Sequence, residues 1–179
     1  MDPHVIFSKF LSTLRKVDES LQNESYVFSQ PEGEIRLKPP KNIPVSMIHN
    51  HMLNHGFIQC ATTEIEDWKW DNGVRLRQED GQTTIIQKTQ VGNAFKFATD
   101  TGWKGRVVVS TETSLDERPT TTCSFYRKAQ RVTFKMHDEI FRVDLTYNSS
   151  TVELEIEILD HTVDPSVVML LVTNICCGQ

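Results

Sequence analysis

Three stretches of the chain have the apolar pattern or the boundary residues of a helix. Over residues 4–22 apolar side chains recur every three or four positions, which predicts an amphipathic helix. Residues 45–55 are predicted as a second helix that Gly56 ends, because glycine favours the position after a helix C-terminus. The apolar segment 164–176 is predicted as a packing helix capped by Asp164, although its β-branched residues also allow a strand.

Most of the remaining chain alternates apolar and polar residues in short runs. Alternation predicts strands, because successive side chains of a strand point to opposite faces of a sheet. Turn residues such as Asp80-Gly81 separate the runs, and this close spacing favours an antiparallel barrel or sandwich. The predicted strands are residues 26–38, with an interruption around Pro31 and Gly33, and then 57–64, 66–70, 73–78, 83–90, 105–112, 122–129, 131–136, 140–146 and 151–159.

The length and composition fit one domain that is slightly short of apolar residues. The chain has 179 residues, of which 38% are hydrophobic, and a chain of this size buries a core without needing disulfides or metal staples. A modest apolar content suits a barrel whose interior is polar. We expect a single domain over residues 1–179, with an N-terminal helix in 1–25, strands in 26–160 and a C-terminal helix in 161–179.

The charge balance argues against a general nucleic-acid binder. Nineteen Lys and Arg against 24 Asp and Glu give a net charge of −5, whereas such proteins present a basic face. A local basic pocket is still compatible with this balance, but sequence-specific nucleic-acid binding is not expected. No apolar run approaches the roughly 18 residues of a membrane span, so no membrane partner is expected. The four Cys lack metal or CxxC spacing and are predicted to be reduced thiols of an intracellular protein.

The polar faces of the predicted strands carry mainly Glu and Arg. Glu153, Glu155 and Glu157 share one face of their strand, and Glu32 and Glu34 share a face near the start of the chain. For a single strand, a solvated outer face is the simplest explanation. Glu is nevertheless depleted in strands, and three glutamates on one strand face repel one another. A bound cation would stabilise such a row. Arginines alternate in the same way at Arg75 and Arg77, at Arg127 and Arg131, and at Arg142.

Together, the Glu and Arg rows suggest one cavity lined by charged side chains. If they face the inside of a closed barrel, the carboxylates form a cation site beside an arginine-rich anion site. Carboxylate oxygens favour Mg²⁺ or Mn²⁺, which proteins commonly share with substrate phosphates, and Arg binds phosphate through two parallel hydrogen bonds. An ordinary β-barrel with wet outer faces is the alternative.

Five segments stand in the order found in a known enzyme family. They are Glu32-Gly33-Glu34-Ile35-Arg36, the run Val107 to Glu112, the pair Arg127 and Arg131, Arg142-Val143-Asp144-Leu145-Thr146, and the run Val152 to Ile158. In these segments the chain resembles the metal-dependent RNA 5′-triphosphatases of the fungal, protozoan and viral type, which are triphosphate tunnel metalloenzymes. The resemblance implies an α+β, mostly β fold: a closed antiparallel β-barrel, the triphosphate tunnel, with helices packed beneath it.

The resemblance also implies a role for each matching residue. The implied metal ligands are Glu32, Glu34 and Glu157, and the implied water-orienting residue is Glu112. Glu153 and Glu155 would position the metal site and the basic residues of the tunnel. The implied phosphate contacts or supports are Arg127, Arg131, Arg142, Asp144 and Thr146, with Arg75, Arg77 and Lys88 as further contacts. Ala129 replaces a lysine that the family often has, so that contact is missing or supplied by Lys135.

The implied activity is hydrolysis of the γ-phosphate of 5′-triphosphate RNA ends, the first step of mRNA capping. The resemblance implies Mg²⁺ or Mn²⁺ as cofactor, nucleoside triphosphates as further substrates and a separate guanylyltransferase as partner. Capping implies a nuclear location, or a cytoplasmic viral factory if the source is viral. Two alternatives stay open: another tunnel-fold hydrolase acting on tripolyphosphate, thiamine triphosphate or ATP, and a non-catalytic tunnel-fold binding domain.

The tryptophans have the chemistry to stack on RNA bases. Trp68 and Trp70 are predicted to pack in the core or at the rim. Trp103 follows a glycine in a turn and is expected to be the exposed one.

Overall fold

The computed structural model describes residues 2–23, 29–136 and 138–177. The helices are α1 (Pro3–Asn23), α2 (Val45–Asn54) and α3 (Pro165–Cys177). The strands are β1 (Ser29–Lys38), β2 (Ile58–Lys69), β3 (Val74–Glu79), β4 (Gln82–Ala98), β5 (Lys104–Ser114), β6 (Phe125–Lys135), β7 (Phe141–Tyr147) and β8 (Val152–Ile158).

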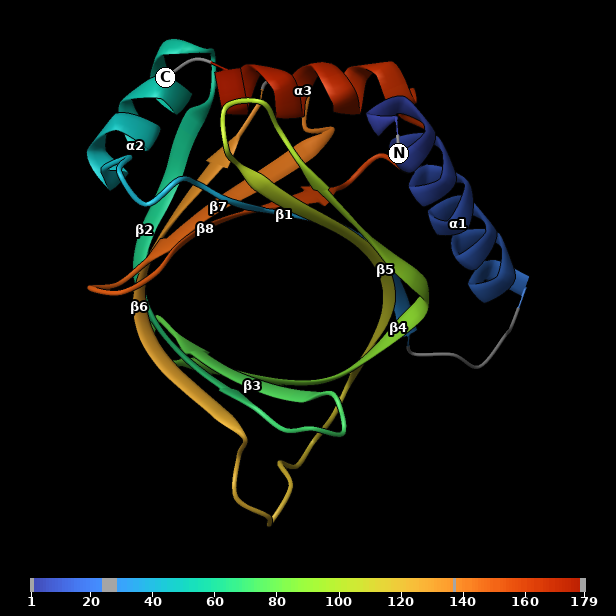
Figure 1. The fold of residues 1–179 in the computed structure, drawn as a ribbon. Helices are drawn as coiled ribbons and strands as arrows, with labels where there is room; N and C mark the ends of the chain where they lie inside the picture. Colours follow the sequence, from blue (N-terminus) through green and yellow to red (C-terminus); the bar gives the residue numbers. More distant parts are fainter. Residues whose placement is uncertain (1, 24–28, 137, 178–179) are drawn as a thin grey trace.

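The strands form a closed antiparallel barrel in the order β1-β5-β4-β3-β2-β6-β7-β8 (Figure 1). Closure depends on β1, which pairs with β5 on one side and with the last strand, β8, on the other. The register sets Glu34 opposite Glu157 and Arg36 opposite Glu155. The two glutamate-rich strands, far apart in the sequence, are therefore neighbours. The predicted fold class is confirmed.

The main hydrophobic core lies outside the barrel, between the strands and the helices. The outward side chains of β1 and β8, such as Ile35 and Ile156, are fully buried in it. The helix α1 adds Phe10 and Leu14 to the same core. Figure 1 shows α2 and α3 along one side of the ring of strands and α1 beside β4 and β5, with β3 on the opposite side. Most apolar residues therefore face the helices and most polar residues face the lumen, while Trp70, Val74 and Leu76 form a second small core on the outer side of β3.

Two predicted pairs of strands are single strands. The segments 57–64 and 66–70 form β2, and 122–129 and 131–136 contribute to β6. The apparent break arises where Ile65 stands opposite Ala129, since these apolar residues are on the same faces as Asp67 and Arg127. Such a pair interrupts the polar row without ending the strand.

The predicted interruption of β1 is also wrong within the described residues, while residues 26–28 of that prediction lie outside them. Gly33 continues the strand because α1 packs directly on its α-carbon. A Cβ at this position would meet Leu14 at 2.5 Å and Phe10 at 3.0 Å. Pro31 is tolerated because β8 pairs only with residues 33–37, so one edge of the strand needs no N–H donor at this point.

The helix predictions are confirmed, and one tryptophan prediction is wrong. Gly56 follows α2 with φ of +84°, and the Ser166 N–H donates to the Asp164 carboxylate at 2.8 Å at the start of α3. Trp103 is fully buried in the main core because its turn packs against the helices. No helix among the described residues is long and apolar enough to cross a membrane. The four cysteines, all within the described ranges, form no disulfide.

Candidate active site

The barrel encloses a cavity of about 440 Å³ whose lining is mostly charged. The lining includes the predicted site residues Glu32, Arg75, Arg77, Lys88, Glu112, Arg131, Arg142 and Glu155. It also includes Asp67, Trp68, Lys69, Glu79, Thr84, Ile86 and Thr133. Side chains of both signs therefore converge in one enclosed space, although their positions in the sequence span more than a hundred residues.

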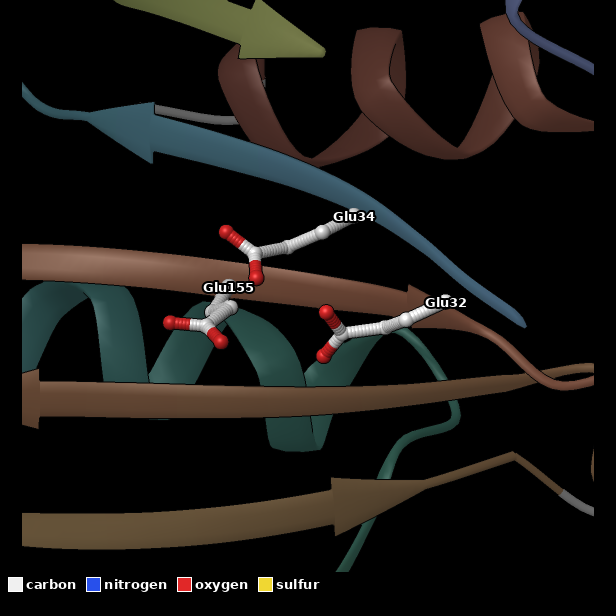
Figure 2. A group of neighbouring side chains, drawn as sticks. All are labelled: Glu32, Glu34 and Glu155. Carbon is white, nitrogen blue, oxygen red and sulfur yellow. The ribbon is translucent and has the colours of Figure 1, made fainter. Parts of the chain in front are cut away.

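Three carboxylates lie close together at one side of this cavity, as Figure 2 shows: Glu32 and Glu155 line it, and Glu34 is buried behind them. Glu32 and Glu34 come from β1, and Glu155 comes from β8. One oxygen from each lies within 4.8 Å of the others. The geometry follows from strand periodicity, which puts Glu32 and Glu34 on one face, and from the β1–β8 register, which sets Glu155 opposite Arg36 on the same inward side, diagonal to Glu34. Three hard oxygen donors at this spacing suit Mg²⁺ or Mn²⁺.

The converging set contains Glu155, whereas the sequence indicated Glu157 as the third ligand. Glu157 lies opposite Arg142 on β7. Its carboxylate oxygen forms an ion pair with the Arg142 guanidinium nitrogen at 2.6 Å. This pairing draws the Glu157 carboxylate toward β7. Glu155 has a looser ion pair with Arg36 at 3.8 Å, and its carboxylate turns to Glu32 and Glu34 (Figure 2).

Lys88 provides a positive charge to the glutamate cluster. Its ammonium lies 2.8 Å from Glu34 and 3.3 Å from Glu112, and it also pairs with Glu32. Burial raises the pKa of Glu32, and the neighbouring carboxylates of Glu34 and Glu112 add to this rise against the effect of Lys88. Burial also acts to raise the pKa of Glu34, but Arg36 and Lys88 outweigh it and lower that pKa. The fully buried Glu34 is thus the carboxylate most firmly held as an anion.

The arginines of the cavity are held by carboxylates behind them. Arg131 pairs with Asp144 and with Glu79, the latter at 3.1 Å. Burial opposes ionisation of Asp144, but the hydrogen bond and charge of Arg131 lower its pKa. A guanidinium fixed in this way presents its remaining N–H groups without having to reorganise when a phosphate binds.

Asp67 holds two further arginines in the same manner. The Arg77 Nε donates to one oxygen at 2.6 Å and the Arg127 Nε donates to the other at 2.8 Å. Arg127 also approaches Glu153 at 4.0 Å. Asp67 therefore aligns β3 and β6 side chains across β2.

The remaining predicted residues support the wall of the cavity. Thr146 is buried and stands between Arg131 and Glu153 in the strand register. Arg127, Asp144, Glu153 and Thr146 are on inward-facing positions but do not line the cavity surface, and Glu34 lies beneath it. Ala129 stands opposite Ile65, and Lys135 stands opposite Arg142.

Sequence reasoning missed four charged residues of the site: Arg36, Asp67, Lys69 and Glu79. Arg36 links Glu34 to Glu155, and its place in the same alternating row as Glu32 and Glu34 was a usable signal. Asp67 and Lys69 gave a weaker signal because Ile65 breaks the polar row of their strand. Glu79 is the last residue of β3, and only the register brings it to Arg131.

The fold is shared with solved structures. The RNA triphosphatase Pct1 of S. pombe, in complex with the Spt5 CTD, superposes with a TM-score of 0.60 at 13% identity, over 93% of this chain and 90% of that one. The RNA triphosphatase domain of the mimivirus mRNA capping enzyme gives 0.52 at 15% identity, over 90% and 93%. The chain has the fold of these RNA triphosphatases.

The fold is also shared with a protein whose name states no activity. The PH1012 protein of Pyrococcus horikoshii OT3 gives a TM-score of 0.53 at 11% identity, over 80% of this chain and 89% of that one. No protein-family model matches the chain, and no curated protein matches it either. At these identities the likeness establishes the tunnel architecture, and the chemistry rests on the residues in the lumen.

Proposed function

We propose that this chain is a metal-dependent hydrolase that removes the γ-phosphate from 5′-triphosphate ends of RNA and, as a side activity, from nucleoside triphosphates. The observation that carries the proposal is the meeting of Glu32, Glu34 and Glu155 beside arginines in one closed cavity. A site with carboxylates alone suits a cation, and a site with arginines alone suits an anion. Their combination suits a metal-bound phosphate.

The carboxylates and the arginines of the cavity would have different roles in this reaction. Glu32, Glu34 and Glu155 would hold Mg²⁺ or Mn²⁺, which supplies Lewis-acid polarisation of a phosphoryl oxygen. Arg131 and Arg142 would bind the phosphoryl oxygens, and their fixed partners keep them oriented. Glu112 lines the cavity on β5 and is about one-third exposed, which makes it the candidate for orienting the attacking water.

The proposal includes a place in cap formation. Removal of one phosphate leaves a diphosphate RNA end, which a separate guanylyltransferase would consume. The S. pombe neighbour, an RNA triphosphatase, supports this reading of the fold. Inorganic tripolyphosphate and ATP are the competing substrates to compare with RNA.

The test is phosphate release from triphosphate-ended RNA with Mg²⁺ and from ATP with Mn²⁺. Glu32→Gln, Glu34→Gln and Glu155→Gln should each reduce turnover by at least about 100-fold, because each removes a charged ligand and is otherwise nearly isosteric. Glu157→Gln should cost less than Glu155→Gln, because Glu157 is engaged with Arg142. The matched control is Glu64→Gln on β2, whose exposed side chain pairs with Lys128 on the outer surface.

The outcomes separate the parts of the proposal. Turnover that persists in EDTA would reject the metal dependence. Loss of activity in Glu157→Gln but not in Glu155→Gln would restore the ligand set indicated by the sequence. Hydrolysis of tripolyphosphate without any release from RNA ends would assign the chain to another tunnel hydrolase.

A further inference from the structure

One end of the barrel carries basic residues of three neighbouring strands in like-charged pairs. Arg106 on β5 stands opposite Arg36 on β1 and, on its other side, opposite Lys96 on β4. Lys104 on β5 stands opposite Lys38 on β1. Like charges directly opposite each other in a sheet are destabilising, so an anion bound here would relieve a repulsion that is built into the sheet.

These basic residues share the face of the sheet that continues into the lumen. Val107, the residue after Arg106, is buried in the main core on the outer side, and successive side chains of a strand alternate between faces. The Arg106 guanidinium donates to the side chain of Gln90 at 3.0 Å. Gln90 stands opposite Ser110, whose hydroxyl donates to Glu32 at 3.1 Å. The like-charged pairs therefore extend the lining of the lumen outward.

Three of these cations are exposed and lack an acidic partner. Lys96, Lys104 and Arg106 are all exposed, and none of them forms a salt bridge with any residue that the structure describes. Lys38 approaches Glu153 at 3.9 Å, but its side chain is 67% exposed. We call Lys38, Lys96, Lys104 and Arg106 the basic mouth.

The hairpin of β4 and β5 holds most of the basic mouth in place. It reaches past the shorter strands toward α3 (Figure 1), where the Thr101 hydroxyl donates to the Cys176 carbonyl at 2.9 Å. On the outer face of the hairpin, the Phe97 ring packs edge-on against Phe7 with the ring centroids 5.6 Å apart. Trp103 is fully buried. The cations are therefore carried by a packed hairpin and not by a free loop.

Further cations connect the basic mouth to the glutamates. Because neighbouring strands are antiparallel, Lys69 at the end of β2 and Arg75 near the start of β3 lie at the same end of the barrel. Both line the cavity, and neither forms a salt bridge within the described ranges. Burial lowers the pKa of Lys69 to about 8 together with the charges of Arg75 and Arg36, so these three cations lie near one another. Positive charge thus continues from the mouth into the cavity.

We propose that the basic mouth is where the RNA strand enters: it binds the phosphodiester groups that follow the 5′ end, while the triphosphate extends past Lys69 and Arg75 to the glutamates. This inference rests on the proposed function and adds to it the feature that favours an RNA end over a free polyphosphate. Tripolyphosphate fills only the lumen and makes no contact with the basic mouth.

Continuity with the cavity favours an RNA strand over an acidic protein as the occupant. The 5′-triphosphate and the phosphates after it belong to one chain, and the cations follow one another from the lumen to the outside. The protein as a whole is acidic, with a net charge of −5, so its composition does not account for a basic surface at this end. Positively charged grooves that follow the backbone are the common way to bind single strands.

The decisive experiment compares a substrate that continues beyond its triphosphate with one that does not. The mouth variant combines Lys96→Gln, Lys104→Gln and Arg106→Gln. In this variant the ratio of kcat/KM for triphosphate-ended RNA to kcat/KM for inorganic tripolyphosphate should fall at least about fivefold, because only RNA loses phosphate contacts.

The matched control has the same change in net charge at other exposed positions. It combines Lys9→Gln and Lys16→Gln on α1 with Lys128→Gln on the outer surface of β6. The control variant should keep the wild-type ratio, because long-range attraction by the net charge is reduced equally in both variants.

The salt dependence of turnover tests the same surface. Each phosphate contact to a single strand contributes about 0.7 to the slope of log affinity against log salt concentration. With RNA, the slope of log kcat/KM against log KCl concentration should therefore be shallower by about 2 in the mouth variant. With tripolyphosphate, the two slopes should agree.

The failures are distinguishable. If the wild type hydrolyses neither RNA ends nor tripolyphosphate, the proposed function is wrong, and hydrolysis of tripolyphosphate alone would overturn the entrance with it. If the wild type hydrolyses both, an unchanged ratio in the mouth variant, or an equal fall in the control variant, overturns the entrance and leaves the proposed function standing. Polyglutamate that binds the wild type more tightly than 5′-hydroxyl RNA, and does not bind the mouth variant, would assign the surface to a protein partner instead.

Discussion

Oppositely charged neighbours keep the buried carboxylates of the lumen ionised. Arg36 and Lys88 hold Glu34 as a carboxylate despite complete burial, and the arginines keep Asp67 and Asp144 ionised. Lys69 differs from them: burial lowers its pKa, and the charges of Arg75, Arg36 and Arg127 lower it further against the opposing effect of Asp67. Its behaviour therefore reports directly on anion binding.

Lys69 should make substrate affinity depend on pH. With a pKa of about 8, Lys69 is protonated at pH 7 and largely neutral at pH 9, so the free enzyme loses a phosphate-binding charge over this interval. The KM for tripolyphosphate should rise about tenfold or less between these two pH values in the wild type. In Lys69→Arg the rise should disappear, because guanidinium stays charged.

Steady-state kinetics at saturating metal measure this effect. The charged groups that face Lys69 are Arg75 on β3, Arg36 on β1, Arg127 on β6 and Asp67 on its own strand. An equal rise in Lys69→Arg would assign the titration to another group.

The sequence predicts some of these residues and not others. The parity of Glu32 and Glu34 places both on one face without further information. The choice between Glu155 and Glu157 depends on which carboxylate Arg142 attracts, and parity does not distinguish residues on the same face. Asp67 and Lys69 were missed because the apolar residue Ile65 occupies a lumen position before them.

At the level of elements, the contact between α1 and β1 determines how the first glutamate strand lies. Gly33 sits between Glu32 and Glu34, and its missing side chain lets α1 approach the strand. Helix and strand periods were sufficient to predict these elements. The continuity of β1 through Gly33 and Pro31 was not predictable, because it depends on tertiary contacts with α1 and on the end of the β8 pairing.

Gly33→Val should destabilise the protein by about 1–3 kcal/mol, since its side chain would collide with Leu14 in a packed interface. Thermal or denaturant unfolding measures the loss. Leu14→Ala alone should cost about 2–5 kcal/mol because Leu14 is fully buried.

The double variant is the control for this mechanism. Valine at position 33 would occupy part of the space that Leu14 vacates, so the combined loss should be smaller than the sum of the single losses. Strict additivity would show that the collision is not the cause.

For the whole molecule, the central problem is the concentration of charge inside a closed barrel. Lys88 of β4 is only 7% exposed and contacts glutamates of β1 and β5, so it joins three strands across their inner faces. The resemblance in the sequence predicted that the two glutamate strands meet. The role of Lys88 as their counter-ion depends on the β4–β5 register, which sets it opposite Glu112.

Lys88→Met should therefore destabilise the metal-free protein by about 3–5 kcal/mol near pH 7.5, because it leaves the mostly buried Glu32 without its counter-ion. Without Lys88, burial and mutual repulsion keep the pKa of Glu32 above its unfolded value. A raised pKa makes stability fall as pH rises, so the deficit should shrink at pH 5. Mn²⁺ should reverse part of the fall in melting temperature that Lys88→Met causes.

Thermal unfolding with and without Mn²⁺ at both pH values tests this. Lys128→Met is the control, because Lys128 is half exposed and pairs with Glu64 on the outer surface, where little change is expected. A deficit in Lys88→Met that is the same at both pH values and insensitive to Mn²⁺ would mean lost packing and not lost charge.

The position of the core outside the barrel has an evolutionary consequence. Because the apolar contacts that stabilise the strands are made with the helices, the lumen is relieved of most of the packing that normally constrains an interior. Substitutions that exchange one polar lumen residue for another alter what is bound more than whether the chain folds. A lineage with this architecture can therefore change what its lumen binds while the contacts between strands and helices stay the same.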